Sequence, residues 1–416
     1  MGKLALLWRY KSSIIKFYYA LFCNKVRAIL HRLTYSPGPN PKRVVVVGAS
    51  FCGYTVAKQL ANTLPSGYAV TVVEKTDCHN HTFVFPRFSV FDGHEDLAFI
   101  PMDKRNSAVT PKGSLEFIFD GCKEVRKERD QNILILESGT TLAYEFLVIA
   151  TGSHTSGPID LDNKSRKEGI SKLKRNQELI RAAKSIAIVG AGAVGVELAT
   201  DIKYLYGDSK SVVLFNSRNY ILPKFPKIVS QHVGPELERL NVVVRNNARP
   251  TASGNTLIFK DGAREDFDLV FVCTGAKSNS GPFKGILGDA IDETTGEIMV
   301  EDTLQVQNAE HPNVFALGDV MKNDGQPKMG RSAFVQSPIV VQNIVKLIKN
   351  DPDAVLSKYR PDPLETALKL TLGLDRDLNH SADFAEVQLH KEDYTMMSEY
   401  TWRFFDVDYE MFQGHR

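Results

Sequence analysis

The sequence predicts an α/β fold with two parallel sheets, each covered by helices on both faces. Three observations support this fold class. From about Pro41 onward, apolar runs of strand length alternate with segments of helical periodicity. A unit of strand, glycine-rich turn, helix and strand begins at Val44 and begins again at Ser185. Two further buried strands both end in Thr-Gly, as "LVIATG" over 147–152 and "VFVCTG" over 270–275.

The composition excludes several classes of protein. With 43% hydrophobic and 24% charged residues, the 416-residue chain can fill about two or three cores of ordinary size. A formal net charge of +2 gives no concentrated basic face, so no nucleic-acid partner is expected. The five scattered cysteines indicate a reducing compartment and no redox disulfide. "CHNH" at 78–81 has no partner set for a metal site, so no metal is expected.

Residues 1–41 are predicted to form a basic, apolar segment followed by a linker. No Asp or Glu precedes Glu74, and the most apolar stretch, "SSIIKFYYALFC", is interrupted by Lys16 and is shorter than the about 20 residues of a membrane span. The pattern is typical of a mitochondrial transit peptide or of a helix lying on an anionic membrane surface. The alternative is an amphipathic helix docked on the protein body, which is compatible with a cytoplasmic protein.

The first unit carries the turn "VVVVGASFCG", over 44–53, and its second strand ends at Glu74. In a dinucleotide-binding turn the first glycine makes the turn, the second admits the pyrophosphate and the third lets the helix pack on the strand. Gly48 and Gly53 hold the first and third places, and Ser50 holds the second with a hydroxyl that can donate to phosphate. Glu74 stands where a carboxylate accepts from a ribose, which predicts FAD or NAD on this unit.

The second unit has all three glycines, since "GAGAVG" supplies Gly190, Gly192 and Gly195. A helix follows, and the next strand ends as "FNSRNY" without a carboxylate. Asn216 leaves room for a 2′-phosphate, and Arg218 can pair with it. The sequence therefore predicts that this unit binds NADPH at least as well as NADH.

The remaining elements complete two nucleotide-binding domains. Thr151 with Gly152, and Gly275, end strands where backbone can approach a ligand. "NVFALGDV", which contains Gly318 and Asp319, precedes a long helix predicted from about Arg331 to Ile348. The predicted organisation is a segment and linker over 1–41, an FAD-binding domain over 42–157 and 265–349, an inserted NAD(P)H-binding domain over 158–264, and a small α+β domain over 350–416.

These motifs resemble the FAD-dependent pyridine nucleotide-disulfide oxidoreductase superfamily. Within it, the sequence is similar to the apoptosis-inducing-factor-like, mitochondria-associated type 2 group (ferroptosis suppressor proteins) and to the type II NAD(P)H dehydrogenases. The likeness covers roughly Arg43 to Asp383 and is carried by the segments "VVVVGASFCG", "KTDCHNHTFVFPRFSV", "LVIATGS", "IAIVGAGAVGVELATDIK", "VFVCTG", "NVFALGDV" and "PKMGRSAFVQSPIVVQNIVKLI". It implies FAD on the first unit, NAD(P)H on the second, and electron delivery to a quinone.

The resemblance also implies roles for single residues. Asp319 would grip the ribityl chain of FAD, and the helix from Arg331 would point its N-terminus at the flavin. The loop with His79, His81 and Arg87 would lie beside FAD. The residues implied in binding the two cofactors are Gly48, Ser50, Gly53, Glu74, Arg87, Thr151, Gly152, Gly190, Gly192, Gly195, Arg218, Gly275, Gly318 and Asp319.

Two residues are implied to be catalytic. Glu197 matches a glutamate near the nicotinamide and the flavin, and its alternative is a solvated carboxylate in the first helical turn. Lys328, in "PKM", matches a lysine near the flavin ring, and its alternative is a solvated loop cation. Gln336 stands where type II dehydrogenases carry a quinone-site glutamine, but "RSAFVQSP" departs from their pattern and leaves the acceptor open.

The predicted function is an NAD(P)H oxidoreductase that passes electrons through FAD to a quinone or another small acceptor. An apoptosis-inducing-factor-like flavoprotein with a signalling or partner-binding role is one alternative. A flavin oxidase of secondary metabolism is another. Disulfide reductases need a cysteine pair beside the flavin, and "FCGYTVAKQL" offers only Cys52, which excludes that branch. The sequence does not set the oligomeric state.

Overall fold

The computed structural model describes Ile15, Tyr19, Cys23, Val26 and residues 28–154, 162–323, 327–350, 353–382 and 384–410. Most of the predicted N-terminal targeting segment therefore lies outside the described residues. The same holds for the predicted domain boundary at 157 and 158, for Asp383, and for residues 411–416.

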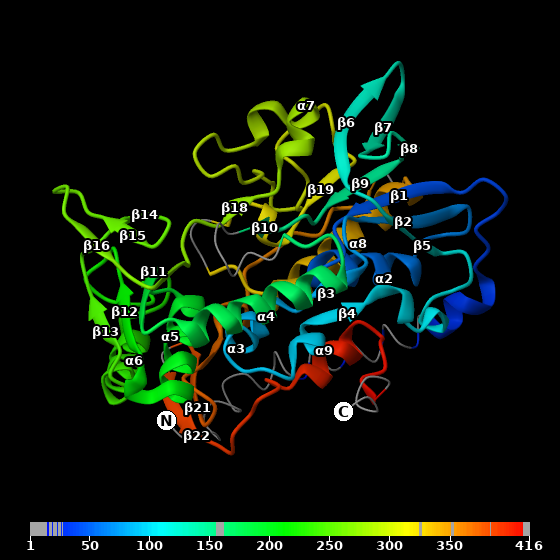
Figure 1. The fold of residues 1–416 in the computed structure, drawn as a ribbon. Helices are drawn as coiled ribbons and strands as arrows, with labels where there is room; N and C mark the ends of the chain where they lie inside the picture. Colours follow the sequence, from blue (N-terminus) through cyan, green and yellow to red (C-terminus); the bar gives the residue numbers. More distant parts are fainter. Residues whose placement is uncertain are drawn as a thin grey trace.

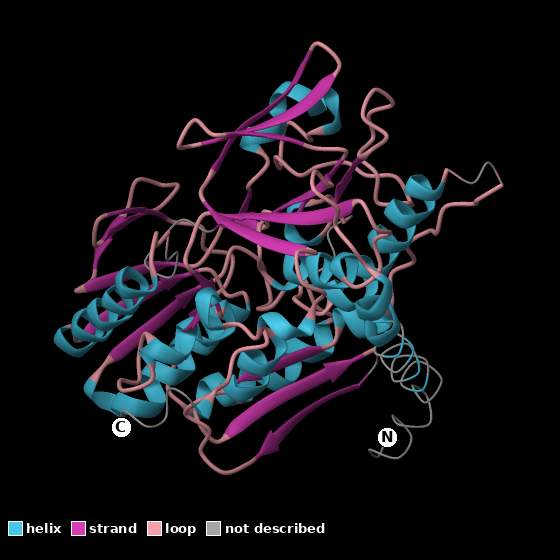
Figure 2. Cartoon of the chain, turned by 90° about the vertical axis from the view of Figure 1, so that its right-hand side faces the viewer, coloured by secondary structure: helices cyan, strands magenta, loops and turns pink. Residues whose placement is uncertain are grey.

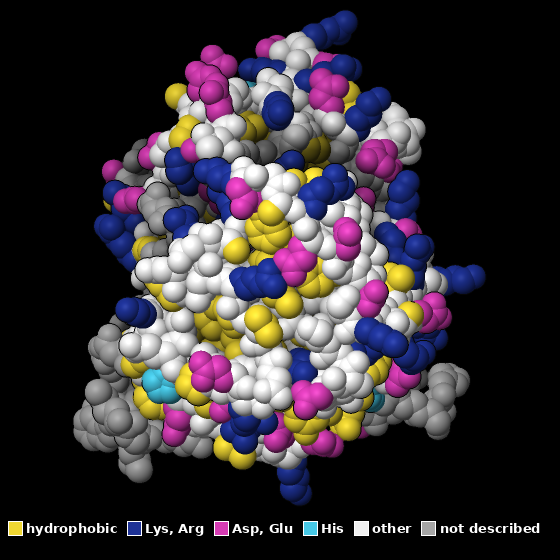
Figure 3. All heavy atoms as spheres, turned by 60° about the vertical axis from the view of Figure 1, so that its left-hand side comes forward, with side chains coloured by type: hydrophobic (Ala, Val, Ile, Leu, Met, Phe, Trp, Pro, Cys, Tyr) yellow, Lys and Arg dark blue, Asp and Glu magenta, His cyan; other side chains and the backbone are white. Residues whose placement is uncertain are grey.

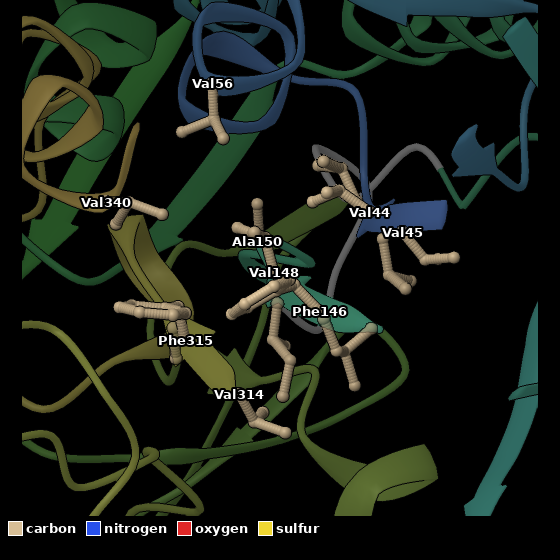
Figure 4. Packing of buried hydrophobic residues seen from close by; sticks show 14 of the residues in the cluster. Val44, Val45, Val56, Phe146, Val148, Ala150, Val314, Phe315 and Val340 are labelled. Atoms are coloured by element: carbon tan, nitrogen blue, oxygen red, sulfur yellow. The ribbon is translucent and has the colours of Figure 1, made fainter. Parts of the chain in front are cut away.

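The first parallel sheet has the strand order β19-β9-β1-β2-β5. Its β-branched runs are buried on both faces, as expected for parallel strands covered by helices. Val44 and Phe315 of the sheet share one hydrophobic core with Val56 of α2 and Val340 of α8 (Figure 4). The bounds are β1 Lys42–Val47, β2 Tyr68–Glu74, β5 Leu115–Phe119, β9 Phe146–Ile149, β19 Val314–Ala316, α2 Phe51–Ala61 and α8 Ser332–Lys349.

The second parallel sheet has the order β13-β12-β11-β17. The predicted end of this domain at residue 264 is too early, because β17 pairs in parallel with β11 and so belongs to the second sheet. The other predicted boundaries stay predictions. The bounds are α4 Arg166–Ala182, β11 Ser185–Val189, α5 Ala193–Tyr206, β12 Ser211–Phe215, α6 Lys227–Arg239, β13 Val243–Arg245, β14 Thr251–Ser253, β15 Thr256–Ile258, β16 Arg264–Asp266 and β17 Leu269–Val272.

The chain passes between the two sheets along a two-stranded antiparallel link, in which β10 pairs with β18. The second sheet is therefore inserted in the chain between strands of the first (Figure 1). The link and the smaller elements around the first sheet are β3 Cys78–Asn80, α3 Phe85–Phe88, β4 Phe99–Pro101, β6 Cys122–Glu128, β7 Gln131–Leu136, β8 Thr141–Ala143, β10 Ser153–His154, β18 Lys277–Ser278 and α7 Lys284–Leu287.

The C-terminal α+β region divides between the two nucleotide-binding units. Its antiparallel sheet, β20-β21-β22, packs on α5 and α6, so these helices lie between two sheets (Figures 1 and 2). Helix α9 instead packs against the first unit, where Trp402 shares a core with Tyr54 and Phe88. The bounds are β20 Leu368–Thr371, β21 Arg376–Ser381, β22 Phe384–Leu389 and α9 Ser398–Phe404.

The surface carries both signs of charge. On the face shown in Figure 3, Lys and Arg side chains are interspersed with Asp and Glu, and apolar side chains are exposed between them. Within the described part of the chain, no helix is both long and apolar enough to span a bilayer.

Candidate active site

The first glycine-rich turn requires glycine at two of its three positions. Gly48 has a φ of 97°, and a Cβ there would lie 2.4 Å from the carbonyl oxygen of Ala150. A Cβ on Gly53 would lie 1.9 Å from the carbonyl oxygen of Gly48, so the helix packs on the turn only with glycine. Ser50 is exposed, with an ordinary φ of −75°, and therefore tolerates a side chain. This turn retains the features needed to receive a pyrophosphate at the start of α2.

The second turn repeats these constraints. Gly190 has a φ of 120°, and a Cβ there would lie 2.6 Å from the carbonyl oxygen of Cys273. A Cβ on Gly195 would lie 1.9 Å from the carbonyl oxygen of Gly190. Gly192 precedes α5 with open space around it, since no atom lies within 4 Å of its added Cβ. Here too the residue at the middle position leaves room for a phosphate, and both turns fit a dinucleotide.

Glu74 ends β2 beside the first turn. Its Oε2 accepts from the backbone N–H of Ala49 at 2.7 Å. Its Oε1 accepts from the N–H of Thr76 at 3.1 Å and from the Oγ1 of Thr76 at 3.0 Å. These bonds hold the carboxylate next to the glycine-rich turn, on the side where a ribose would lie.

The corresponding strand end of the second sheet has amides in place of a carboxylate. Asn216 is buried, and its Nδ2 donates to the Oδ1 of Asn246 at 2.7 Å and to the carbonyl of Arg218 at 3.0 Å. Arg218 itself is exposed. Its guanidinium is accessible to a 2′-phosphate, and the phosphate contact stays a prediction.

The two Thr-Gly strand ends meet the link between the sheets. Thr151 donates through Oγ1 to the carbonyl of Asn279 at 2.9 Å, and the Nδ2 of Asn279 donates to the carbonyl of Thr151, also at 2.9 Å. Gly152 and Gly275 have φ values of 65° and 78°, which favour glycine. Sequence reasoning missed Asn279, and no motif around it marks its position.

Lys328 contacts Asp319, which follows strand β19 of the first sheet. Burial raises the pKa of the Asp319 carboxyl, and the charge of Lys328 opposes this rise. Lys328 donates through Nζ to the backbone carbonyl of Asp319 and pairs with Glu297 at 2.6 Å. Only 18% of the Lys328 side chain is exposed, so the solvated-cation alternative is wrong. Glu297, its ion-pair partner, was not found from the sequence.

Gly318, beside Asp319, connects this site to α8. Its φ is 75°, and a Cβ there would lie 2.9 Å from the Sγ of Cys52. Its N–H donates to the Oε1 of Gln336 at 2.8 Å. Gln336 is buried and therefore supports the turn from inside α8. Its match to a quinone-site glutamine stays a prediction.

Glu197 is buried in the first turns of α5. Its Oε1 accepts from the N–H and from the Oγ1 of Thr371, both at 3.2 Å. Burial raises the pKa of the carboxyl to about 8, with a further rise from Asp201 and opposition from Arg87. The solvated-carboxylate alternative is wrong, because the side chain is buried. A pKa of about 8 favours the protonated carboxyl at neutral pH.

Arg87 makes its observed contacts with protein groups. The side chain is 1% exposed, and its Nε donates to the Oδ2 of Asp201 at 2.8 Å. Its other two nitrogens donate to the carbonyls of Asp393 and Gly373. A contact with FAD stays a prediction. His79 and His81 are also buried, and the His79 ring stacks on Phe405 with centroids 3.6 Å apart.

All five cysteines are free thiols in the structure. Burial raises the pKa of the Cys52 thiol strongly, which disfavours the thiolate that redox chemistry uses. In the described ranges, no three His, Cys, Asp or Glu side chains are grouped as metal ligands would be.

This fold and this site define a nucleotide-binding flavoprotein, and comparison with known proteins gives the family. Residues 42–342 match the model of the pyridine nucleotide-disulphide oxidoreductase family. The chain belongs to this family, and FAD and NAD(P)H are its cofactor and substrate.

Three relatives are similar over most of their length. Fe-regulated protein 8 of Mycosarcoma maydis is 32% identical, covering 88% of this chain and 96% of the relative. Ferroptosis suppressor protein 1 of Xenopus tropicalis is 30% identical, covering 79% and 86%. Apoptosis-inducing factor homolog B of Dictyostelium discoideum is 30% identical, covering 77% and 84%.

Two solved structures share the fold. The sulfide:quinone oxidoreductase of Aquifex aeolicus has a TM-score of 0.69 at 19% identity, over 87% of this chain and 90% of that one. NDH2 of Plasmodium falciparum, in complex with NADH, has a TM-score of 0.65 at 12% identity, over 87% and 94%.

Proposed function

We propose that this chain transfers electrons from NAD(P)H through FAD to a quinone-like acceptor. The observation that carries the proposal is the pair of turns, Gly48–Gly53 and Gly190–Gly195. Each combines a glycine at positive φ with a second glycine in contact with the first. When bound, FAD supplies the chemistry that takes a hydride from NAD(P)H and passes two electrons onward.

The residues of the chain bind and orient the two nucleotides. The turn before α2, with the carboxylate of Glu74, would hold the adenylate end of FAD. The turn before α5 would hold the pyrophosphate of NAD(P)H, because the space around Gly192 admits backbone contact with a ligand. Asp319 and Thr151, which Asn279 holds through two hydrogen bonds, would hold the middle of FAD.

Glu197 and Lys328 are the proposed catalytic residues. With a pKa of about 8, the Glu197 carboxyl can donate a proton, or a hydrogen bond, near the nicotinamide. Lys328 places a cation beside Asp319, where it can stabilise negative charge. Neither residue is proposed to form a covalent bond with substrate.

The proposed binding of NADPH at least as well as NADH depends on Arg218. A charge-assisted hydrogen bond to a 2′-phosphate contributes roughly 1.5 to 3 kcal/mol. We expect Arg218→Glu to lower kcat/KM for NADPH by at least about tenfold, and to change that for NADH by less than about threefold. Steady-state oxidation of both donors by the FAD-loaded protein measures this. An equal loss for both donors would remove Arg218 from the phosphate site.

A quinone-like acceptor is supported by the fold shared with a sulfide:quinone oxidoreductase. The test is NAD(P)H oxidation by the purified protein against a panel of quinones and O2. Quinone-dependent turnover supports the proposal. Rapid peroxide release without quinone would identify an oxidase instead, and slow turnover with every acceptor would favour a signalling role. Loss of flavin absorbance without recovery on addition of any quinone would contradict the proposed acceptor.

We also propose a peripheral membrane contact through the N-terminal segment, either on the mitochondrion or on another anionic membrane. The described helical residues there leave large apolar side chains exposed, with Leu33 at 80% and Tyr19 at 69%. No acidic residue precedes Glu74, so the segment suits anionic lipid. His31 holds the end of this helix to the body, since its Nε2 lies 2.7 Å from the carbonyl of Leu64.

Vesicle sedimentation tests this contact. We expect the full chain to sediment with anionic vesicles more than with neutral ones, and Leu33→Glu to reduce the bound fraction. Thr34→Glu places the same charge on the neighbouring residue and is the control. Equal binding by both variants would contradict the apolar contact. A reporter fused to residues 1–41 separates import into mitochondria from surface attachment.

A further inference from the structure

The Arg87 side chain lies where three parts of the fold meet. It comes from α3 in the first unit, and its Nε donates to Asp201 on α5 in the second unit at 2.8 Å. Its Nη2 donates to the carbonyl of Gly373 at 2.8 Å, and its Nη1 to the carbonyl of Asp393 at 2.6 Å, both in the C-terminal region. The Arg87 side chain is 1% exposed; its bonds to Asp201 and Gly373 are buried, and its bond to Asp393 is partly buried. The guanidinium therefore fixes the three parts relative to one another.

The contact with Gly373 is sterically restricted. Gly373 has a φ of 84°, and a Cβ there would lie 2.5 Å from the Cδ2 of Tyr204 on α5. The turn after β20 thus lies directly on the helix that carries Asp201. Because Thr371 is two residues earlier, the same turn sets the position of the two groups that donate to Glu197.

Glu197 and Asp201 share one face of α5, since they are four residues apart. They have different partners. Asp201 pairs with Arg87 through Oδ2, while its buried Oδ1 has no hydrogen-bond partner among the described residues. Glu197 accepts from the neutral N–H and hydroxyl of Thr371.

The ion pair determines how much of the Arg87 charge Glu197 experiences. Among the described residues, Asp201 from its own helix and Arg87 from α3 are charged groups that act on the Glu197 carboxyl. The strand β20 packed against it contributes Thr371, and the charged Lys369 of that strand pairs with Asp377 at 2.9 Å. Asp201 thus offsets the cation that would otherwise favour ionised Glu197.

We propose that Arg87 is a positioning residue, which acts through Asp201 and the Gly373 turn to hold the Glu197 carboxyl against Thr371. The catalytic role of Glu197 in this inference rests on the proposed function, whereas the positioning geometry does not depend on it. It gives Arg87 a role at the NAD(P)H side of the site, distinct from a direct contact with FAD.

Replacing one member of the pair should shift the titration of Glu197 in a direction set by the charge that is lost. Asp201→Asn keeps an acceptor for Arg87 but removes the negative charge, so Glu197 should ionise at a pH lower by about 1 unit or more. Arg87→Met leaves two buried carboxyls without a cation, so protonated carboxyl should persist to higher pH than in the wild type.

Infrared difference spectroscopy of the FAD-loaded protein, titrated without NAD(P)H, measures the protonated-carboxyl band, and Glu197→Gln assigns it. Arg87→Lys keeps the cation and should restore a midpoint within about 1 unit of the wild type. Arg181→Met, which breaks the exposed Arg181–Asp92 pair, should leave the band unchanged. If Asp201→Asn and Arg87→Met both lower stability but leave the midpoint unmoved, the pair is only structural and the proposal is overturned.

Kinetics separate this proposal from the proposed function. If the band shifts as expected, Asp201→Asn should also lower the rate of flavin reduction by NADH about tenfold, with KM changed less than about threefold. A shifted band with an unchanged reduction rate would support the positioning of Glu197 and contradict its catalytic role.

Discussion

Two carboxyls one helical turn apart have different environments in this protein. Asp201 has a cation at 2.8 Å, whereas Glu197 accepts from the neutral donors of Thr371 and has a pKa of about 8. Neighbouring positions on one helix face therefore carry a carboxyl paired with Arg87 and a carboxyl bonded to Thr371. Burial raises the pKa of both, and at Asp201 the Arg87 cation opposes the rise. The sequence places both side chains on α5 but does not distinguish them, because Thr371 is 174 positions away.

The pKa of Glu197 predicts a dependence of stability on pH. With its pKa of about 8, the folded state keeps the proton to about pH 8, while the unfolded chain releases it near the ordinary value of 4.5. The stabilising contribution is therefore full below pH 4.5 and is lost as pH rises to about 8, by about 1.4 kcal/mol per pH unit.

Glu197→Gln should abolish this loss, so the variant should gain stability relative to the wild type across that range of pH. Thermal unfolding of both proteins at a series of pH values measures the difference. Glu178→Gln changes an exposed glutamate on α4 and is the control. A difference between Glu197→Gln and wild type that stays flat with pH would exclude a buried, protonated Glu197.

The glycines of the second turn predict two different defects. Gly195→Ala places a Cβ 1.9 Å from the carbonyl of Gly190, and the overpacked turn should lose about 1–3 kcal/mol of stability. Gly192→Ala meets no atom and should cost less than about 1 kcal/mol, but should weaken NAD(P)H binding. Thermal unfolding and donor titration test the pair. Equal stability of the two variants would contradict the packing role of Gly195.

At the scale of elements, α9 connects the end of the chain to the first unit. Trp402 is fully buried and donates through Nε1 to the carbonyl of Leu97 at 3.0 Å. Asp406, just after the helix, accepts from the hydroxyl of Tyr54 at 2.6 Å and pairs with Lys58. This helix therefore covers the start of α2, close to the first glycine-rich turn.

Trp402→Ala should undock α9. Removing a buried aromatic side chain costs about 3–5 kcal/mol, enough to release a seven-residue helix from the surface of the first unit. We expect limited proteolysis to cut residues 390–410 faster in this variant. Tyr400→Ala, which removes a side chain that is 71% exposed on the same helix, should leave the rate unchanged. Equal cutting of both variants would contradict the docking.

At the scale of the whole molecule, the sequence predicted those strands and helices that the local residue pattern determines. The strands β1, β2, β11 and β12 and the helix α8 end within a residue or two of their predicted bounds. Contacts between distant parts of the chain determine which sheet or unit an element packs in, and the sequence did not predict these. β17 pairs in the second sheet, although the Thr-Gly that follows it repeats the one that follows β9 in the first sheet. Helix α9 packs on the first unit and not on the C-terminal sheet.

The candidate site shows the same division. The sequence reveals the outer glycines of both turns, because their spacing is that of a turn in which a side chain would clash with backbone. These are Gly48, Gly53, Gly190 and Gly195. The contacts of Arg87 could not, because its partners come from α5 and from two separate C-terminal turns. Asp201 was detectable in principle, since an acid four residues after Glu197 lies on the same helix face.

The open middle position of the glycine-rich turn bears on how such proteins are detected. Ser50 and Gly192 occupy equivalent places, both with ordinary φ values, while the glycines on either side are held by steric contact. Evolution can thus vary the middle residue and keep the outer two. A search pattern that demands all three glycines would overlook the flavin-side turn of this chain, whereas one weighted toward the outer pair would retain it.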